Sequence, residues 1–167
     1  MGMSVTLAAA TEDDAERILK LQYLCFQEEA ELYGDYSLEP LTQSLAALRT
    51  ELAAGLVLVA RLGDEVVGSA RGTVGEDGTA LISGLMVHPR MQRHGLGGRL
   101  LAAIEERLAA ERSADRYRLA TGHRNERTLR LYRGWGYERV AVERVTGKRS
   151  VVTLEKVAVP AKEPARV

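Results

Sequence analysis

ALISGLMVHPRMQRHGLGGRLL, residues 80–101, is the stretch from which the fold of this chain can be inferred. The apolar run from Leu81 to Val87 predicts a strand, and Pro89 ends it because proline cannot donate to the hydrogen-bond ladder of a sheet. Three glycines follow a short basic turn, and apolar residues then recur at helical spacing as far as Leu108. The stretch therefore predicts a strand, a glycine-rich turn and a helix.

The turn has the chemistry of an anion-binding site. The first turn of a helix presents unpaired N–H donors and a partial positive charge, and glycines let the backbone approach an anion closely. Arg90 and Arg93 add charged donors suited to phosphate. A helix start with exposed arginines is the alternative. A P-loop and a dinucleotide fingerprint are excluded, because no Gly-Lys-Ser/Thr follows Gly98 and Leu100 replaces the third glycine.

Two blocks of sequence carry a resemblance to a known family. Gln92-Arg93-His94-Gly95-Leu96-Gly97, after Val87-His88-Pro89, is similar to the Q/R-x-x-G-x-G/A signature of the GNAT superfamily of acyl-CoA-dependent N-acetyltransferases. Downstream, that family's "N…LY…GF" helix is resembled by Asn125, Leu131, Tyr132, Trp135, Gly136 and Tyr137. The similarity covers residues 4–156, nearly a whole domain.

The resemblance implies the fold and the co-substrate. The fold is an α/β (α+β) domain, whose mixed, mostly antiparallel sheet of six to seven strands carries about four helices on its faces. Acetyl-CoA is the implied co-substrate, held by backbone groups where the central strand separates from the next. Gly84 is typical of a bulge that exposes such groups. The implied cofactor-binding residues are Leu85, Met86, Val87, Gln92, Arg93, His94, Gly95, Leu96, Gly97, Gly98, Asn125 and Tyr132.

The same resemblance assigns catalytic roles to Tyr132 and Leu85. A phenol of pKa about 10 can return a proton to a thiolate of similar basicity, which makes Tyr132 the general acid. Without the resemblance, Tyr132 would be interpreted as a core aromatic at helical spacing. Leu85 would contribute a backbone N–H that stabilises the oxyanion. Asn125 is expected to cap the helix that carries Tyr132 and to contact the cofactor.

The acceptor pocket is predicted in an acidic connection between the first two helices, a region that lines this pocket in the resembled family. No Lys or Arg occurs from Leu21 to Leu48. Carboxylates and aromatic faces attract an ammonium group, so a small cationic amine or a peptide amine is expected as acceptor. A solvated loop is the alternative. The expected substrate-binding residues are Glu31, Tyr33, Asp35 and Tyr36.

The sequence leaves the general base open. An amine of pKa near 10 must lose a proton before it attacks. Some relatives carry a glutamate early in the central strand, but Leu81 stands at the matching position here. Glu31, Asp35, His123 and water chains to solvent remain as candidates. The histidines are scattered without paired cysteines or carboxylates, so no metal site is expected.

Composition bounds the class of protein. The 167 residues favour a single acetyltransferase-like domain over 1–158, with a flexible tail over 159–167. The single cysteine, Cys25, fits a cytoplasmic location, and no apolar run reaches the roughly 18 residues of a membrane span.

The net charge of the chain is zero, but 12 arginines fall in residues 86–139, and this local positive charge suits a polyanion such as CoA. Balanced charge and few interleaved aromatic residues argue against nucleic acid as a partner.

Hydrophobic periodicity predicts the remaining elements. Strands are expected over 4–10, 56–61, 65–74, 116–122, 138–144 and 150–156, and helices from 11 to about 27, over 41–52 and over 125–135.

The resemblance and the residues that carry it leave two functions to weigh. The leading one is an N-acetyltransferase that works in a ternary complex, with a homodimer possible. The alternative is a non-catalytic acyl-CoA-binding module of the same fold.

Overall fold

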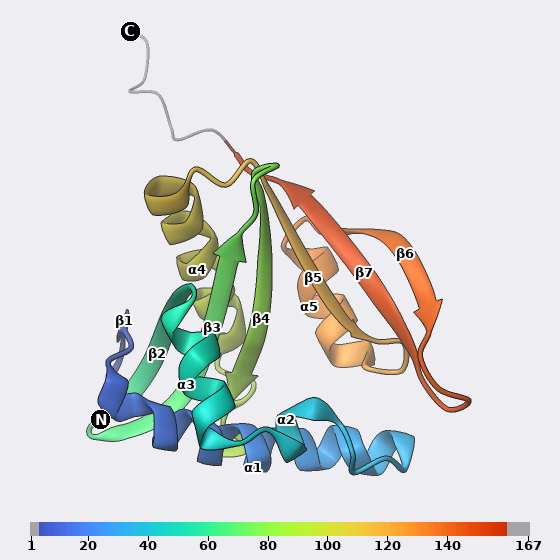
Figure 1. Cartoon of the computed structure of the whole chain (residues 1–167), viewed down its shortest axis with the longest axis horizontal. Helices are drawn as coiled ribbons and strands as arrows, with labels where there is room; N and C mark the ends of the chain where they lie inside the picture. Colours follow the sequence, from blue (N-terminus) through green and yellow to red (C-terminus); the bar gives the residue numbers. More distant parts are fainter. Residues whose placement is uncertain (1–3, 160–167) are drawn as a thin grey trace, which may run out of the picture.

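A seven-stranded sheet with helices on both faces forms the part of the chain, residues 4–159, that the computed structural model describes (Figure 1). The strand order is β1-β2-β3-β4-β5-β7-β6, and only β4 and β5 pair in parallel. The prediction of a mixed, mostly antiparallel sheet is therefore confirmed. The expected four helices become five α-helices, one of which is a single turn.

The observed strands begin and end within two residues of the predicted ones, because glycine and proline mark most of the turns between them. They are β1 Val5–Ala9, β2 Leu56–Leu62, β3 Glu65–Val74, β4 Thr79–Val87, β5 Arg116–Gly122, β6 Glu138–Arg144 and β7 Ser150–Val157. The α-helices are α1 Ala15–Tyr33, α2 Glu39–Thr42, α3 Leu45–Ala53, α4 Leu96–Arg112 and α5 Glu126–Gly134. Of the tail predicted at 159–167, residues 160–167 lie outside the described part.

The first helix departs most from the prediction, since it continues to Tyr33 and does not end near Gln27. Gly34, with a φ of 61°, ends it in the left-handed conformation that glycine adopts readily. Ala30 and Tyr33 are buried, so packing supports a segment that is polar in sequence. Consequently Glu31 and Tyr33 lie on a helix, and the predicted acidic connection is much shorter than expected.

The second predicted helix, 41–52, is also wrong as a single element. The chain is extended at Gln43 and Ser44, and this divides the segment into α2 and α3. The Ser44 side chain accepts a hydrogen bond from the Ala47 N–H at 3.1 Å and so caps α3. A new helix therefore begins at this cap, although the apolar spacing of the leucines is continuous across the break.

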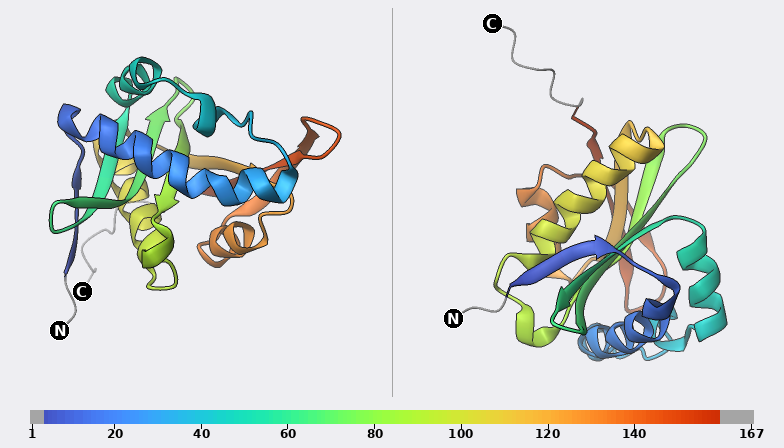
Figure 2. Two further views of the ribbon diagram at one scale, coloured as in Figure 1. Left: turned by 90° about the horizontal axis from the view of Figure 1, so that it is seen from below. Right: turned by 90° about the vertical axis from the view of Figure 1, so that its left-hand side faces the viewer.

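Helices cover both faces of the sheet (Figure 2), and an apolar core lies beneath the helices on each face. On one face α4 and α5 pack through residues such as Leu100 and Leu129. On the other face α1 and α3 pack through residues such as Ile18 and Leu48. Strand β4 contributes Ile82 to the first core and Met86 to the second. Because burial of one such side chain contributes about 1.5–3 kcal/mol, β4 is held firmly between both layers.

The two halves of the sheet separate beside β4. Strands β4 and β5 pair only at Thr79–Leu81 with Arg116–Arg118, and Figure 1 shows them diverging beyond this point. This confirms the predicted separation of the central strand from the next. Helix α1 runs across the lower end of the sheet, past the gap between the two strands (Figure 1).

Among residues 4–159, none of the helices combines the length and the continuous apolar character that a membrane span requires.

Candidate functional site

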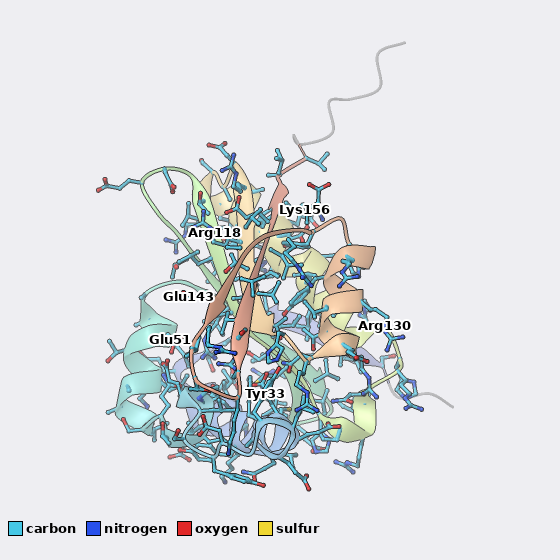
Figure 3. All side chains as sticks on the ribbon, turned by 90° about the vertical axis from the view of Figure 1, so that its right-hand side faces the viewer. Tyr33, Glu51, Arg118, Arg130, Glu143 and Lys156 are labelled. Atoms are coloured by element: carbon cyan, nitrogen blue, oxygen red, sulfur yellow. The ribbon has the colours of Figure 1, made fainter. Side chains whose placement is uncertain are left out.

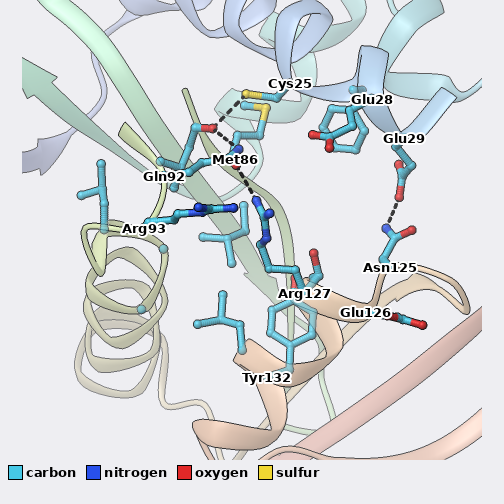
Figure 4. A pocket seen from close by; sticks show the side chains of 18 of the residues that line it. Cys25, Glu28, Glu29, Met86, Gln92, Arg93, Asn125, Glu126, Arg127 and Tyr132 are labelled. Atoms are coloured by element: carbon cyan, nitrogen blue, oxygen red, sulfur yellow. Dashed lines mark hydrogen bonds between the residues drawn. The ribbon is translucent and has the colours of Figure 1, made fainter. Parts of the chain in front are cut away.

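A cleft of about 540 Å³ occupies the gap where β4 and β5 separate (Figure 4). Its walls come from α1, the end of β4, the glycine-rich turn with the start of α4, and the start of α5. Three segments that are far apart in sequence, 25–32, 85–98 and 124–132, thus meet at one cavity. The volume is within the range of small-molecule sites, which bury most of the surface of their ligands.

The cleft brings together nearly all the residues predicted to bind a cofactor. The wall contains Leu85, Met86, Val87, Gln92, Arg93, Gly95, Leu96, Gly97, Gly98, Asn125 and Tyr132. His94 belongs to the same turn but is not part of the wall. None of the predicted substrate-binding residues, Glu31, Tyr33, Asp35 and Tyr36, contributes to it.

The glycine-rich turn supplies backbone N–H groups to one end of the cleft. Gly95 is the N-cap of α4 with a φ of 75°, and no side chain caps this helix. Arg93 also has a positive φ, 71°, which is unusual for a residue with a side chain and occurs preferentially at functional sites. The first N–H groups of α4 are therefore left for a ligand, in the manner of helix starts that bind anions.

Gly98 has a different role from the glycines before it. A Cβ added at Gly98 would lie 2.8 Å from Nε1 of Trp135, whereas one added at Gly95 would meet nothing within 4 Å. The absence of a side chain at Gly98 is thus required by close packing of α4 against the Trp135 indole. Gly95, in contrast, is surrounded by open space that a ligand can enter.

The end of β4 turns backbone groups into the cleft. The N–H of His88 donates to the carbonyl of Val67 at 2.8 Å, and Val87 stands opposite Gly68 in the β3–β4 pair. Since hydrogen-bonded and non-hydrogen-bonded pairs alternate along an antiparallel ladder, Val87 points its N–H and C=O away from β3. By the same alternation the N–H and C=O of Leu85 face the gap.

Side chains already contact part of this backbone edge. The carbonyl of Val87 accepts hydrogen bonds from the Gln92 amide at 3.2 Å and from the Cys25 thiol at 3.4 Å (Figure 4). Burial raises the pKa of the Cys25 thiol to about 12, so this side chain is a neutral donor and not a nucleophile. Arg127 in turn donates to Oε1 of Gln92 at 2.8 Å.

Tyr132 lies in the wall of the cleft, on α5, and is 6% exposed. Within residues 4–159 its hydroxyl has no hydrogen-bond partner. Burial, and secondarily the negative charge of Glu29, raise the pKa of the Tyr132 phenol, so it stays protonated at neutral pH. A protonated phenol in a cleft is suited to donate a proton.

Asn125 does not act as the predicted cap. It stands at the N-cap position of α5, but its side chain makes no capping hydrogen bond. Its amide donates instead to Glu29 and to Thr121 Oγ1, the latter at 2.9 Å, and its oxygen accepts from the Tyr33 hydroxyl at 2.7 Å. The Tyr33 hydroxyl accepts from the Arg124 N–H at 2.9 Å. These contacts join α1 to the start of α5 across the gap.

Tyr33 therefore supports the cleft from behind and does not face it. It is 2% exposed, and Figure 3 shows it between α1 and the sheet. The other predicted substrate-binding residues lie on the outside. Glu31 is exposed on α1, Tyr36 is 59% exposed, and Asp35 accepts hydrogen bonds from Ser37. Their prediction assumed a loop where the chain is helical.

The side chains of α1 that do line the cleft were not predicted as site residues. They are Cys25, Phe26, Glu28, Glu29 and Leu32. Their spacing of three and four residues continues one face of the helix, and this signal would have identified them had the helix been extended to Tyr33. Glu28 is exposed at the cleft and has no hydrogen-bond or ion-pair partner among the described residues.

His123, one of the candidate bases, lies away from the cleft wall. Its Nδ1 accepts from the Ser150 N–H at 2.9 Å, which fixes it at the start of β7. Among the described residues no three His, Cys, Asp or Glu side chains converge as possible metal ligands.

The chain belongs to the acetyltransferase (GNAT) family, whose model matches residues 15–137. Solved structures share its fold over nearly their whole length. The ribosomal-protein-S18-alanine N-acetyltransferase from Escherichia coli aligns with a TM-score of 0.78 and 16% identity, covering 98% of this chain and 100% of that one. The yncA protein from Salmonella typhimurium, solved with acetyl-CoA as its cofactor, aligns with a TM-score of 0.73 and 17% identity, covering 98% of this chain and 99% of that one.

A third similar structure is the PaiA N-acetyltransferase from Thermoplasma acidophilum in complex with coenzyme A. It aligns with a TM-score of 0.73 and 18% identity, covering 90% of this chain and 98% of that one. At such identities the likeness shows the fold alone. No curated protein matches the sequence significantly.

Proposed function

We propose that the protein is an N-acetyltransferase that transfers an acetyl group from acetyl-CoA to a primary amine by direct attack in a ternary complex. One observation carries this proposal. A single cleft combines an uncapped helix start, a free strand edge and a protonated tyrosine. The two similar proteins solved with acetyl-CoA or coenzyme A support the choice of co-substrate.

The wall residues fit the parts of acetyl-CoA. The uncapped N–H groups that follow Gly95 suit the diphosphate, and the guanidinium groups of Arg93 and Arg127 add charge at the cleft wall. The free C=O of Leu85 and the free backbone groups of Val87 suit the amide-bearing pantetheine arm, which can extend the sheet as a further strand would. Bound in this way, acetyl-CoA supplies an acetyl group activated as a thioester.

The residues of the chain then serve one acyl transfer. An ammonium acceptor first loses one proton. The neutral amine nitrogen then forms a bond to the acetyl carbon, the carbon–sulfur bond breaks, and the nitrogen loses a second proton. The Leu85 N–H stabilises the charge that develops on the acetyl oxygen, a role worth about 2.7–4 kcal/mol for one donor in well-studied enzymes. Tyr132 gives its proton to the departing thiolate, since burial keeps this phenol protonated.

The acceptor is proposed to be a cationic or peptidic primary amine. Glu28 and Glu29 place two carboxylates in the cleft, and such groups attract an ammonium ion. Glu28 takes up the proton that the ammonium loses before attack, because this carboxylate is exposed at the cleft and has no partner among the described residues. The second proton, lost after the bond forms, restores the Tyr132 phenol. Glu31, Asp35 and Tyr36 would contact only the outer part of a larger, peptidic acceptor.

Thiol release from acetyl-CoA across a panel of amines tests this function. The panel should contain small diamines and short peptides with a free α-amino group, because the E. coli relative is named for an alanine acceptor in a ribosomal protein. Turnover with at least one amine is expected. Binding of CoA in a calorimetric titration without turnover for any amine would favour the non-catalytic module. A titration with no binding of CoA would overturn both.

A further inference from the structure

One guanidinium lies buried on the face of the sheet opposite α4. Arg71, on β3, is 8% exposed, and its Nε donates to Oε1 of Glu51 on α3 at 3.0 Å. Its Nη2 donates to Oε1 of Gln22 on α1 at 3.4 Å. The third nitrogen, Nη1, is buried and has no partner among the described residues. Burial of a charged donor without a partner costs free energy.

Gly84 of β4 lies directly against this guanidinium. A Cβ added at Gly84 would be 2.6 Å from Nη1, 2.8 Å from Cζ and 3.1 Å from Nε of Arg71. These three short distances show that the guanidinium occupies the space that a side chain at position 84 would need. Gly84 also has a φ of 62°, which residues with side chains rarely adopt.

Gly84 is part of a bulge that decides where the next backbone groups point. Between the pairs Arg71↔Ser83 and Ser69↔Met86, β4 contains one residue more than β3. Without the extra residue, Leu85 would stand opposite Ser69 and would direct its N–H and C=O to β3. With it, Leu85 faces the cleft. The proposed oxyanion donor therefore depends on this bulge.

We infer that Arg71 is a positioning residue for the acyl-transfer site: its guanidinium, held by Glu51 and Gln22, fixes the bulge at Gly84 and so aims the Leu85 N–H into the cleft. The inference rests on the proposed function. Arg71 acts through the backbone of β4 and contacts no reacting atom. Its planar shape is what matters, since a flat group is needed to cover a glycine at van der Waals distance.

The test compares acetyl-CoA with CoA by isothermal titration of wild type and Arg71→Met. Only acetyl-CoA has the carbonyl that the Leu85 N–H would bind, so loss of positioning should weaken acetyl-CoA and leave CoA unchanged. We expect the wild-type preference for acetyl-CoA to fall by about three- to tenfold, as for the loss of one hydrogen bond. With an amine that is turned over, kcat should fall by roughly 100-fold. Arg71→Lys, which keeps the charge but not the plane, should behave like Arg71→Met.

Arg61→Met is the matched control. Arg61 lies on the neighbouring strand β2 and pairs at 2.6 Å with Asp14, which is buried, so its loss should lower the melting temperature as well. The preference for acetyl-CoA over CoA should not change in this variant. The inference is wrong if Arg61→Met reduces the preference equally, if Arg71→Met keeps both preference and kcat, or if Arg71→Lys restores them.

Glu51→Gln keeps the test decisive if Arg71→Met does not fold. It leaves the Arg71 guanidinium in place and weakens its ion pair with residue 51, so the preference for acetyl-CoA over CoA should fall by about twofold. The amide NMR signal of Leu85 should also respond less to acetyl-CoA than in the wild type. An unchanged preference and an unchanged Leu85 response would refute the role of Arg71. If wild type binds neither ligand, the proposed function fails; if wild type binds both but the variants match it, only the role of Arg71 fails.

Discussion

The glycine-rich turn and the second half of α1 form two walls of one cleft, but the sequence encodes them in different ways. The turn contributes residues that are close together in sequence, 92–93 and 95–98, and its glycines leave backbone groups open to the cleft. Helix α1 acts through side chains such as Cys25, Glu28 and Leu32, which are spaced by the helical period. Glycine and proline make a backbone site visible in sequence, whereas a helix face is assigned to a cleft only by packing. The first wall was therefore predictable, and the second was not.

The largest effect is expected at Tyr132, which α5 contributes to the same cleft. Tyr132→Phe removes the proposed proton donor and should lower kcat by about 100-fold or more. Affinity for CoA should change little, because the ring remains in place. Steady-state kinetics and calorimetry check these two quantities separately. An unchanged kcat would remove Tyr132 from the reaction and leave the turn as a binding site only.

The pH dependence of the same residue follows from its environment. Burial and the charge of Glu29 raise the pKa of the Tyr132 phenol, so its proton is retained to higher pH than in a free tyrosine. We expect no loss of turnover from phenol ionisation between about pH 8 and pH 10. Glu29→Gln removes the negative charge and should move the alkaline fall in activity to lower pH. A fall near pH 9 in the wild type would contradict this assignment.

The turn itself is tested by Gly97→Asp, which places negative charge beside the proposed diphosphate position. A Cβ at Gly97 would meet Leu131 at 3.4 Å, so the variant should fold. Affinity for CoA should fall by about 100-fold in a calorimetric titration. Gly147→Asp is the control, since Gly147 lies in the β6–β7 turn with nothing within 4 Å. Normal affinity in folded Gly97→Asp would show that the turn does not hold the diphosphate.

The α1 wall is tested by Glu28→Gln. Loss of this carboxylate should raise the KM for a small cationic amine by about tenfold at low ionic strength, while affinity for CoA stays within about twofold. Glu31→Gln is the control, because Glu31 lies on the same helix outside the cleft wall. Equal effects of the two substitutions would place the acceptor on the outer surface, as the sequence suggested.

The smallest effect on activity is expected from Tyr33→Phe, behind the wall. This change leaves the Asn125 oxygen and the Arg124 N–H without their partner. The free energy of unfolding should fall by about 1–3 kcal/mol, and CoA affinity and kcat should each change by less than about threefold. Chemical denaturation measures the first quantity. A large loss of turnover with normal stability would instead show that Tyr33 contributes to the acceptor site, as the sequence predicted.

Much of the fold was predictable because it depends on local signals. Pro89 and the turn glycines bound the strands, and Gly84 marked the bulge correctly. The sequence failed where tertiary contacts decide the outcome. Tyr33 extends α1 because its side chain is buried, and the Asn125 side chain bonds to Glu29 and Tyr33 and not to its own helix. Arg71 gave no signal, since its role depends on the packing of β3, β4, α1 and α3.

The contact between Trp135 and Gly98 has a practical consequence. Trp135 is the only tryptophan in the chain, it is 40% exposed, and its indole edge packs against a glycine in the cleft wall. Indole emission depends on the polarity and hydration around the ring. The molecule thus contains one tryptophan next to the wall of the cleft. Selective excitation of this indole should report a bound ligand without any label, through the wavelength and intensity of its emission.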